Sequence, residues 1–289
     1  TGATVTLNTA GVIGTSAKRI QFANNATTTE QKVVIGSVTQ PTTAVYLDGL
    51  NNLTLGNIST NTSNANVNVT ALGGINVNGT ITSGTGTIYL GADRTAADLA
   101  GDGTGTLALM ASSSVTSANT TASAISLRGA DITIDTSGSP ATVSAAGVGG
   151  GVVIGSSVNT RPMMIGDGGA VAGVNLSSAE LAQISENARI TFGDATQTGD
   201  ITFFKATPAT TAGAAIYAIQ DTATGGKIVL DDDFAVAAGT ALAGGSSVIN
   251  LTAGTAGITA VSDSNTAAEI ATTGATVTLN TAGVIGTSA

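Results

Sequence analysis

Carboxylates are the only side chains in this chain that offer closely spaced acid–base or metal-binding chemistry. The 289 residues include no Cys and no His. Thiolate–imidazole catalysis, imidazole acid–base work and zinc or copper sites with nitrogen and sulfur ligands are therefore excluded. The densest acidic group is Asp231–Asp232–Asp233. If residues 228–230 form a strand, Asp231 and Asp233 project to one side, where their oxygens could bind a hard cation such as Ca²⁺.

A solvated turn is the alternative interpretation of this triplet. A Ca²⁺ site needs roughly six or more oxygen ligands, and only three carboxylates are local. The nonapeptide that binds Ca²⁺ in repetitive exoproteins is absent. Gly101–Gly105 has only a weak similarity to it, and we interpret this segment as a turn. We therefore expect no cofactor, with Ca²⁺ at Asp231 and Asp233 as the metal hypothesis.

A second acidic pair, Asp131 and Asp135, flanks the apolar residues of Ile132–Ile134. Glycoside hydrolysis needs two carboxyl groups at a defined separation, usually with aromatic platforms for the sugar. The three tyrosines, Tyr46, Tyr89 and Tyr217, are scattered along the sequence, and no carboxylate pair stands out. The chain is therefore not expected to be an enzyme, and a β-helical enzyme that degrades polysaccharide is kept as an alternative.

One segment has the signature of a helix. Ser177 and Glu180 form the S-x-x-E pattern of a capping box, and Leu176 and Leu181 are spaced as a hydrophobic staple. We predict one short helix within residues 177–185. It either fills a gap in the surrounding strands or serves as a docking surface that includes Ser177, Glu180 and Glu186.

The rest of the chain consists of short runs in which apolar and polar residues alternate, a pattern that is typical of strands. Charged residues make up 9% and aromatic residues 3%, and Gly occupies 39 positions. Thr and Val favour strands, while Asn and Gly favour turns. Clear examples are Leu53–Leu55, Val67–Val69, Ile125–Leu127, Ile190–Phe192 and Val248–Leu251. The composition therefore predicts an all-β protein.

Two features favour a parallel β-helix, or β-solenoid, over other all-β folds. The strands are very short, and their Val, Ile and Leu residues are similar in size, which suits stacking of like on like along an axis. The absence of Trp disfavours sandwich cores. We expect coils of ~20–24 residues and roughly a dozen coils. Stacked Asn side chains are expected at corners or on an outer face, with Asn66, Asn68, Asn76 and Asn78 as candidates. A string of about three immunoglobulin-like sandwiches is the alternative.

The first seventeen residues, TGATVTLNTAGVIGTSA, occur again without change at residues 273–289. Internal repetition of this kind indicates an array whose second copy begins at Thr273. We therefore interpret residues 1–272 as one tandem repeat that forms a continuous β-solenoid. Residues 273–289 are then the start of the next copy.

Charge and hydropathy restrict the partners. The net charge is −9, which disfavours nucleic acid and anionic membranes. The sequence has no apolar run of about 18 residues, so no membrane insertion is expected. The partners that we expect are neighbouring copies of the same repeat, stacked end to end. Other filaments and a host or neighbouring-cell surface are further candidates.

Several phrases resemble the repeat regions of very large bacterial exoproteins. They are "LTLGNI" at residues 53–58, "INVNGTI" at 75–81 and "LSSAELAQI" at 176–184. Taken in order they resemble the filamentous-haemagglutinin-like adhesins and related autotransporter passengers. The resemblance implies a right-handed parallel β-helix shaft that is secreted to the bacterial cell surface.

The expected function is therefore a structural and adhesive segment of an extracellular filament or stalk. In this hypothesis the β-helical coils stack end to end and so lengthen the shaft. The alternative within the same class is an adhesin module that binds carbohydrate or a receptor.

Overall fold

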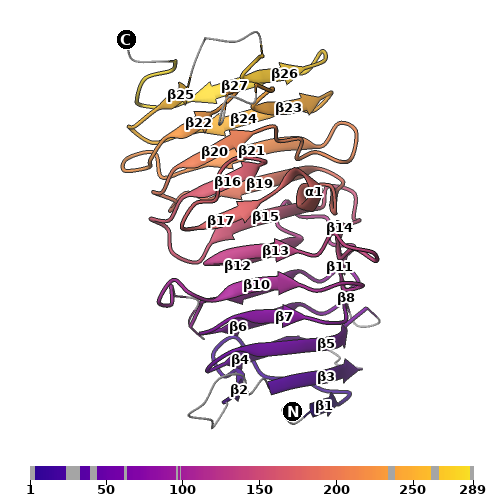
Figure 1. The fold of residues 1–289 in the computed structure, drawn as a ribbon. Helices are drawn as coiled ribbons and strands as arrows, with labels where there is room; N and C mark the ends of the chain where they lie inside the picture. Colours follow the sequence, from indigo (N-terminus) through magenta and orange to yellow (C-terminus); the bar gives the residue numbers. More distant parts are fainter. Residues whose placement is uncertain are drawn as a thin grey trace.

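The chain is an all-β parallel solenoid in the computed structural model, which describes residues 4–23, 33–39, 44–61, 64–95, 97, 99–233, 238–261 and 267–286. Short strands stack along one axis, from the N-terminal residues at one end to the C-terminal residues at the other (Figure 1). All ladders between the named strands in these ranges are parallel, as in Val45–Val67 and Ile125–Val152. The predicted fold class is confirmed, and parallel pairing rules out a string of antiparallel sandwiches.

The strands form three stacks, which we call the first, second and third faces in the order in which each coil visits them. The first face is an unbroken sheet of ten strands. In order along the axis they are β2 (Ile20–Phe22), β4 (Val45–Gly49), β6 (Val67–Ala71), β9 (Ile88–Ala92), β12 (Ile125–Gly129), β15 (Gly151–Ser156), β19 (Arg189–Gly193), β21 (Ala215–Ile219), β24 (Ile249–Thr252) and β27 (Val277–Asn280).

The second face begins with the N-terminal halves of long strands and continues with shorter ones. Its members in axial order are β1 (Thr4–Asn8), β3 (Val33–Thr39), β5 (Leu53–Ser59), β7 (Ile75–Val77), β10 (Thr106–Leu109), β13 (Asp131–Ile134), β17 (Val174–Leu176), β16 (Met163–Gly166), β20 (Ile201–Phe204), β22 (Ile228–Leu230) and β25 (Ile258–Ala260). Here β16 and β17 are neighbours in both sequence and space, so this face gains a strand that the first face lacks.

The third face takes over where β5 bends. Residues Leu53–Leu55 of β5 pair with β7, whereas Ile58 and Ser59 pair with β8 on the third face. The remaining third-face strands are β8 (Thr80–Ser83), β11 (Ser114–Ser117), β14 (Thr142–Ala145), β18 (Ile184–Glu186), β23 (Leu242–Gly245) and β26 (Ile270–Thr272). Ala206 bridges to Leu242 in the same stack.

The length of a coil varies more than the sequence predicts. Val67 stacks on Ile88 and Val152 stacks on Ile190, although nearly twice as much chain separates the second pair. The extra residues of this coil include the added strand β17, and the residues stacked on the first face nevertheless stay in register. The predicted coil of ~20–24 residues fits the two first-face coils that run from Val45 to Ile88. The coil before them, from Ile20 to Leu47, and the coil after them, from Ile88 to Ile125, are longer.

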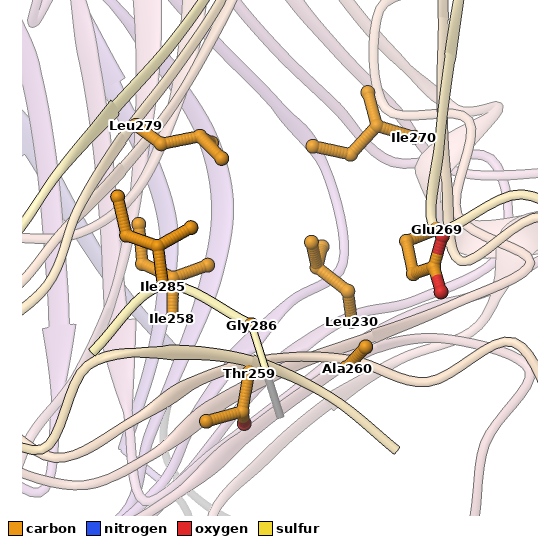
Figure 2. Close-up of a pocket in the computed structure, with 9 residues that line it drawn as sticks. All are labelled: Leu230, Ile258, Thr259, Ala260, Glu269, Ile270, Leu279, Ile285 and Gly286. Atoms are coloured by element: carbon orange, nitrogen blue, oxygen red, sulfur yellow. The ribbon is translucent and has the colours of Figure 1, made fainter. Parts of the chain in front are cut away.

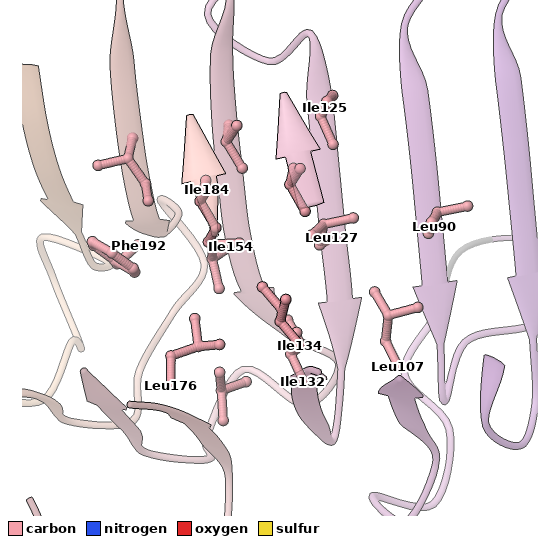
Figure 3. Close-up of a cluster of buried hydrophobic side chains, with 14 of the residues drawn as sticks. Leu90, Leu107, Ile125, Leu127, Ile132, Ile134, Ile154, Leu176, Ile184 and Phe192 are labelled. Atoms are coloured by element: carbon pink, nitrogen blue, oxygen red, sulfur yellow. The ribbon is translucent and has the colours of Figure 1, made fainter. Parts of the chain in front are cut away.

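The core is built from continuous inward rows of aliphatic side chains (Figure 3). On the first face, one inward row is made only of Val and Ile and a second row mainly of Leu. Phe192 stands in the second row with Ala218 beside it, and it meets Phe203 edge to face at 5.8 Å between ring centroids. Full burial of each such side chain contributes about 1.5–3 kcal/mol, so the rows hold the solenoid together.

Asparagine side chains reinforce the corners between coils. The Oδ1 atoms of Asn52 and Asn66 accept hydrogen bonds from the backbone of Gly74 (2.7 Å) and Thr87 (2.8 Å), one coil further along. The predicted Asn66 is thus at a corner, although its amide pairs with backbone and not with another amide. Asn68 lies instead on the outer side of β6, where Arg19 donates to it.

The predicted helix is present as a single turn, α1 (Ser178–Leu181). Ser177 is its N-cap, and both hydrogen bonds of the capping box with Glu180 form. The two staple residues, Leu176 and Leu181, are fully buried. The helix closes the step from β17 on the second face to β18 on the third face, so it fills a gap in the coil.

Candidate functional site

The two copies of the repeated segment have the same local structure. Residues 4–8 form β1, and 277–280 form β27 from the same letters. In both copies a threonine hydroxyl accepts from the amide two residues on: Gly11 to Thr9 at 3.0 Å and Gly283 to Thr281 at 2.9 Å. The glycine that follows the isoleucine has positive φ in each, 68° at Gly14 and 103° at Gly286.

The sheet partners of the two copies differ. The first copy, β1, pairs with β3 on the second and third faces, whereas β27 pairs with β24 on the first face. The isoleucine of each copy also bridges to a different stack. Ile13 pairs with Val45 on the first face, and Ile285 pairs with Ile258 on the second face.

The C-terminal end of the described chain carries an open cavity of about 450 Å³, lined by aliphatic side chains together with Thr259 and Glu269. Leu279, Ile270 and Leu230 extend into the same space from three different strands (Figure 2). Ile285 and Ile258 border the cavity as well. The aliphatic part of the cavity thus continues the line of the core, and this part is suited to burying further aliphatic side chains.

Exposure of the repeated residues shows what a further coil does to this segment. Ile13 is 5% exposed, because the coil of β4 covers it, whereas the identical Ile285 is 53% exposed. The neighbouring valine, by contrast, is exposed in both copies, 50% at Val12 and 57% at Val284. Of these two neighbouring residues, only the isoleucine therefore changes its environment when a coil is stacked upon it.

All three tyrosines, scattered in the sequence, lie in one outward row of the first face. Tyr46 and Tyr89 flank Asn68 in register, and Tyr217 lies further along beside Asn250. Guanidinium groups pack over two of the rings: Arg19 at 5.6 Å from the centroid of Tyr46, and Arg189 at 4.8 Å from that of Tyr217. The three tyrosines of this row are half-buried, and Ser126, Val153 and Thr191 separate Tyr89 from Tyr217.

An ion pair lies at the edge of this face, where Arg128 contacts Asp194. Burial acts to raise the pKa of the Asp194 carboxyl. Hydrogen bonds from Thr196 and Arg128, together with the charge of Arg128, outweigh burial and lower the pKa below its usual value. Arg94 also lies near this edge and donates to the carbonyl of Ser157 at 2.7 Å.

The residues predicted around the helix are engaged within the fold. The Oε2 atom of Glu180 accepts from Ser177 (2.8 Å from Oγ, 2.9 Å from the backbone nitrogen). Its Oε1 atom accepts from the backbone of Ile134 at 2.9 Å, which ties α1 to β13. Ser177 and Glu180 thus position the helix on the neighbouring coil.

Glu186, the third residue predicted in this surface, points inward. It is 1% exposed, and neither carboxylate oxygen has a hydrogen-bond partner. Burial raises the pKa of its carboxyl to about 8, against a weaker opposing contribution from the backbone of Thr210. The side chain therefore holds a proton at neutral pH and belongs to the interior.

The acidic triplet, Asp231–Asp233, directly follows β22, the strand that the sequence predicts at residues 228–230. Asp231 and Asp232 are buried, and the backbone nitrogen of Asp233 donates to Oδ1 of Asp231 at 3.1 Å. Among the residues that the structure describes, no three His, Cys, Asp or Glu side chains gather as metal ligands. Asp231 here caps the turn that ends the strand.

A second cavity, of about 550 Å³, lies near the N-terminal end. Lys18, Arg19, Gln21 and Ala97 are among the residues that line it. In the described part of the chain no helix has the length and apolar character needed to cross a bilayer.

Comparisons with protein-family models, with curated proteins and with solved structures each find no match to this chain.

Proposed function

We propose that this chain is a structural segment of an extracellular filament or stalk on a bacterial surface, lengthened by end-to-end stacking of its coils. The contrast between Ile13 and Ile285 carries the proposal: the same residue is covered in one copy and exposed beside an open, partly aliphatic cavity in the other. A further coil laid on β27 would bury this surface. The resemblance to large bacterial adhesins supports the location.

The mechanism in this proposal is mechanical. Each coil forms parallel ladders with the coil before it, and the inward Val, Ile and Leu rows run through the whole stack. A stacked coil covers an otherwise unpaired strand edge, and unpaired edges promote association. Lengthening the array therefore adds hydrogen bonds and core contacts in equal steps.

A charge placed at the repeated isoleucine tests this function. In the 289-residue chain, Ile13→Asp is expected to destabilise the fold by about 2–4 kcal/mol, because it buries an unpaired carboxylate. Ile285→Asp in the same chain should change stability by less than about 0.5 kcal/mol, because its side chain is half exposed. The measurement is urea unfolding.

The decisive comparison uses a two-copy chain, residues 1–272 followed by a complete second copy. Ile285→Asp, now at the join, should become as damaging as Ile13→Asp is in the single chain. Val284→Asp is the matched control, because valine at this place stays exposed in both copies. If Ile285→Asp remains harmless at the join, the coils do not stack across it and the proposal fails.

We propose carbohydrate binding as the second candidate function, on the basis of the tyrosine row. Tyrosine rings present an apolar surface and a polar hydroxyl together, and the flanking arginines suit acidic sugars. Binding of the protein to acidic sugars on a glycan array should be lost when Tyr46 and Tyr89 are both replaced by Ser. Replacement of Ser126 on the same row by Ala should leave it unchanged, and equal binding by both variants would exclude this surface.

A further inference from the structure

The repeated segment exposes two backbone edges, and each copy uses a different one. In the first copy the groups of Ile13 itself are engaged: its nitrogen donates to Ala44 O at 3.2 Å, and its carbonyl accepts from Tyr46 N at 2.7 Å. In the second copy the flanking residues are engaged instead. Val284 O accepts from Ile258 N, and Gly286 N donates to Ile258 O, both at 2.9 Å.

These two sets of hydrogen bonds have no atom in common once the copies are superimposed by sequence. The groups of Ile13 face the coil that follows, and those of Val284 and Gly286 face the coil that precedes. On the adjoining strand, Thr276 O accepts from Ile249 N at 3.0 Å and Asn280 O from Ala253 N at 2.9 Å, again towards the preceding coil. Because a strand in a parallel sheet pairs with its two neighbours through different backbone groups, one segment can make both sets of bonds at once.

We infer that successive repeats share this segment at each join, and that the faces change identity there. The inference rests on the proposed function, because it requires that repeats stack. The segment 273–289 of one repeat is then also residues 1–17 of the next. Its strand pairs with β24 behind it and with β3 of the following copy ahead of it.

The consequence for the sheets follows from the observed pairs. The first face of one repeat continues through the shared strand into the second and third faces of the next repeat. The second face continues from Ile258, through the shared isoleucine, to Val45 on the first face of the next repeat. The tyrosine row therefore moves to another side of the shaft at every join.

Cysteine cross-linking in the two-copy chain tests this inference, and the natural chain has no Cys to interfere. On the second face, the shared segment places Thr259 of the first copy two strand spacings, about 10 Å, from Tyr46 of the second copy. A flexible bismaleimide that spans this distance should join T259C in the first copy to Y46C in the second.

The matched variant pairs N250C in the first copy with the same Y46C. Asn250 lies on the first face, so it would be in line with Tyr46 of the second copy only if faces kept their identity across the join. We expect a several-fold higher yield of intramolecular cross-link for the T259C pair, measured by gel mobility and peptide mapping. The reagent is calibrated with Y46C and Y89C in one copy, which lie two strands apart.

Each result decides a different point. A higher yield for the N250C pair would overturn the change of faces while supporting end-to-end stacking. No cross-link in either pair, with the Y46C–Y89C control positive, would overturn both the inference and the proposed function. Preference for the T259C pair, together with damage from Ile285→Asp at the join, would support both.

Discussion

At the corner between the third and first faces, one inward row changes from hydroxyl to carboxyl. Ser83, Ser117, Ala145 and Glu186 follow one another in register. Both serine hydroxyls donate to the carbonyl of Gly86, at 2.6 and 2.7 Å, and so are satisfied. Glu186 has no such partner, so the cost of burying its charge keeps it protonated.

This environment predicts how stability depends on pH. The pKa of Glu186 rises from 4.5 to about 8 on folding, so the folded state holds a proton that the unfolded chain has lost between these values. Stability is fully present below the unfolded pKa and falls as pH rises through the folded one. Glu186→Gln, which cannot ionise, should be more stable than the natural chain by about 1–3 kcal/mol near pH 9.

The measurement is urea unfolding from about pH 4 to 9, with the difference between variant and natural chain shrinking towards the acidic end. Glu269→Gln, at a half-exposed carboxyl, is the control and should leave the profile unchanged. Parallel profiles for Glu186→Gln and the natural chain would contradict an ionisable interior carboxyl.

Among the elements, α1 is a short helix that a few side-chain contacts hold in place. Its four residues are too few to form a stable helix in isolation, so neighbouring coils must hold it. Glu180 does this from both oxygens, because one completes the cap and the other accepts from Ile134 on β13. The carboxylate therefore couples a helix start to the strand of the preceding coil.

Glu180→Ala is expected to cost about 2–3 kcal/mol, more than the ~1 kcal/mol typical of a lost cap, because the amide of Ile134 also loses its acceptor. Gln183→Ala, which removes a contact to Ala179 within the same turn, is the control and should cost under about 0.5 kcal/mol. Thermal unfolding of the two variants measures the difference. A cost of only ~1 kcal/mol for Glu180→Ala, the value of the cap alone, would mean that the link to β13 contributes nothing.

The sequence predicts elements well where their determinants are local. The capping pattern of Ser177 and Glu180 needs only one short run of consecutive residues, and alternation within Val67–Val69 is enough to distinguish inside from outside. Coil length is different, because it depends on where a connection returns to the stack. No local pattern within residues 153–189 predicts that Ile190 will pair with Val152.

At the scale of the whole molecule, the candidate sites also depend on coil lengths, which the sequence does not predict. The tyrosines form a row only because two early coils of nearly equal length place Tyr46, Asn68 and Tyr89 in register, and longer coils later restore that register at Tyr217. The duplicated segment is visible in the sequence. Its two sets of partners are not, because they depend on coils far away in the chain.

Nearest-neighbour stacking predicts how stability scales with length. In the two-copy chain the join replaces an exposed end with a covered one, and the added interface stabilises the whole array. The two-copy chain should therefore unfold at a higher urea concentration than the single chain, in a transition that remains cooperative. A two-copy chain in which Val284→Asp replaces the natural residue should behave in the same way, whereas Ile285→Asp should return the midpoint to that of the single chain.

The variable connections between faces have a practical consequence. The short interval from Val67 to Ile88 and the longer one from Ile216 to Ile249 each hold one strand per face and leave the inward rows undisturbed, so the stack tolerates extra chain at its corners. Foreign peptides grafted into the connection between β20 and β21, for example, would be displayed at a fixed height on the shaft. Tandem copies would then present such an epitope at regular intervals, so the molecule could serve as a scaffold that holds ligands at a fixed spacing.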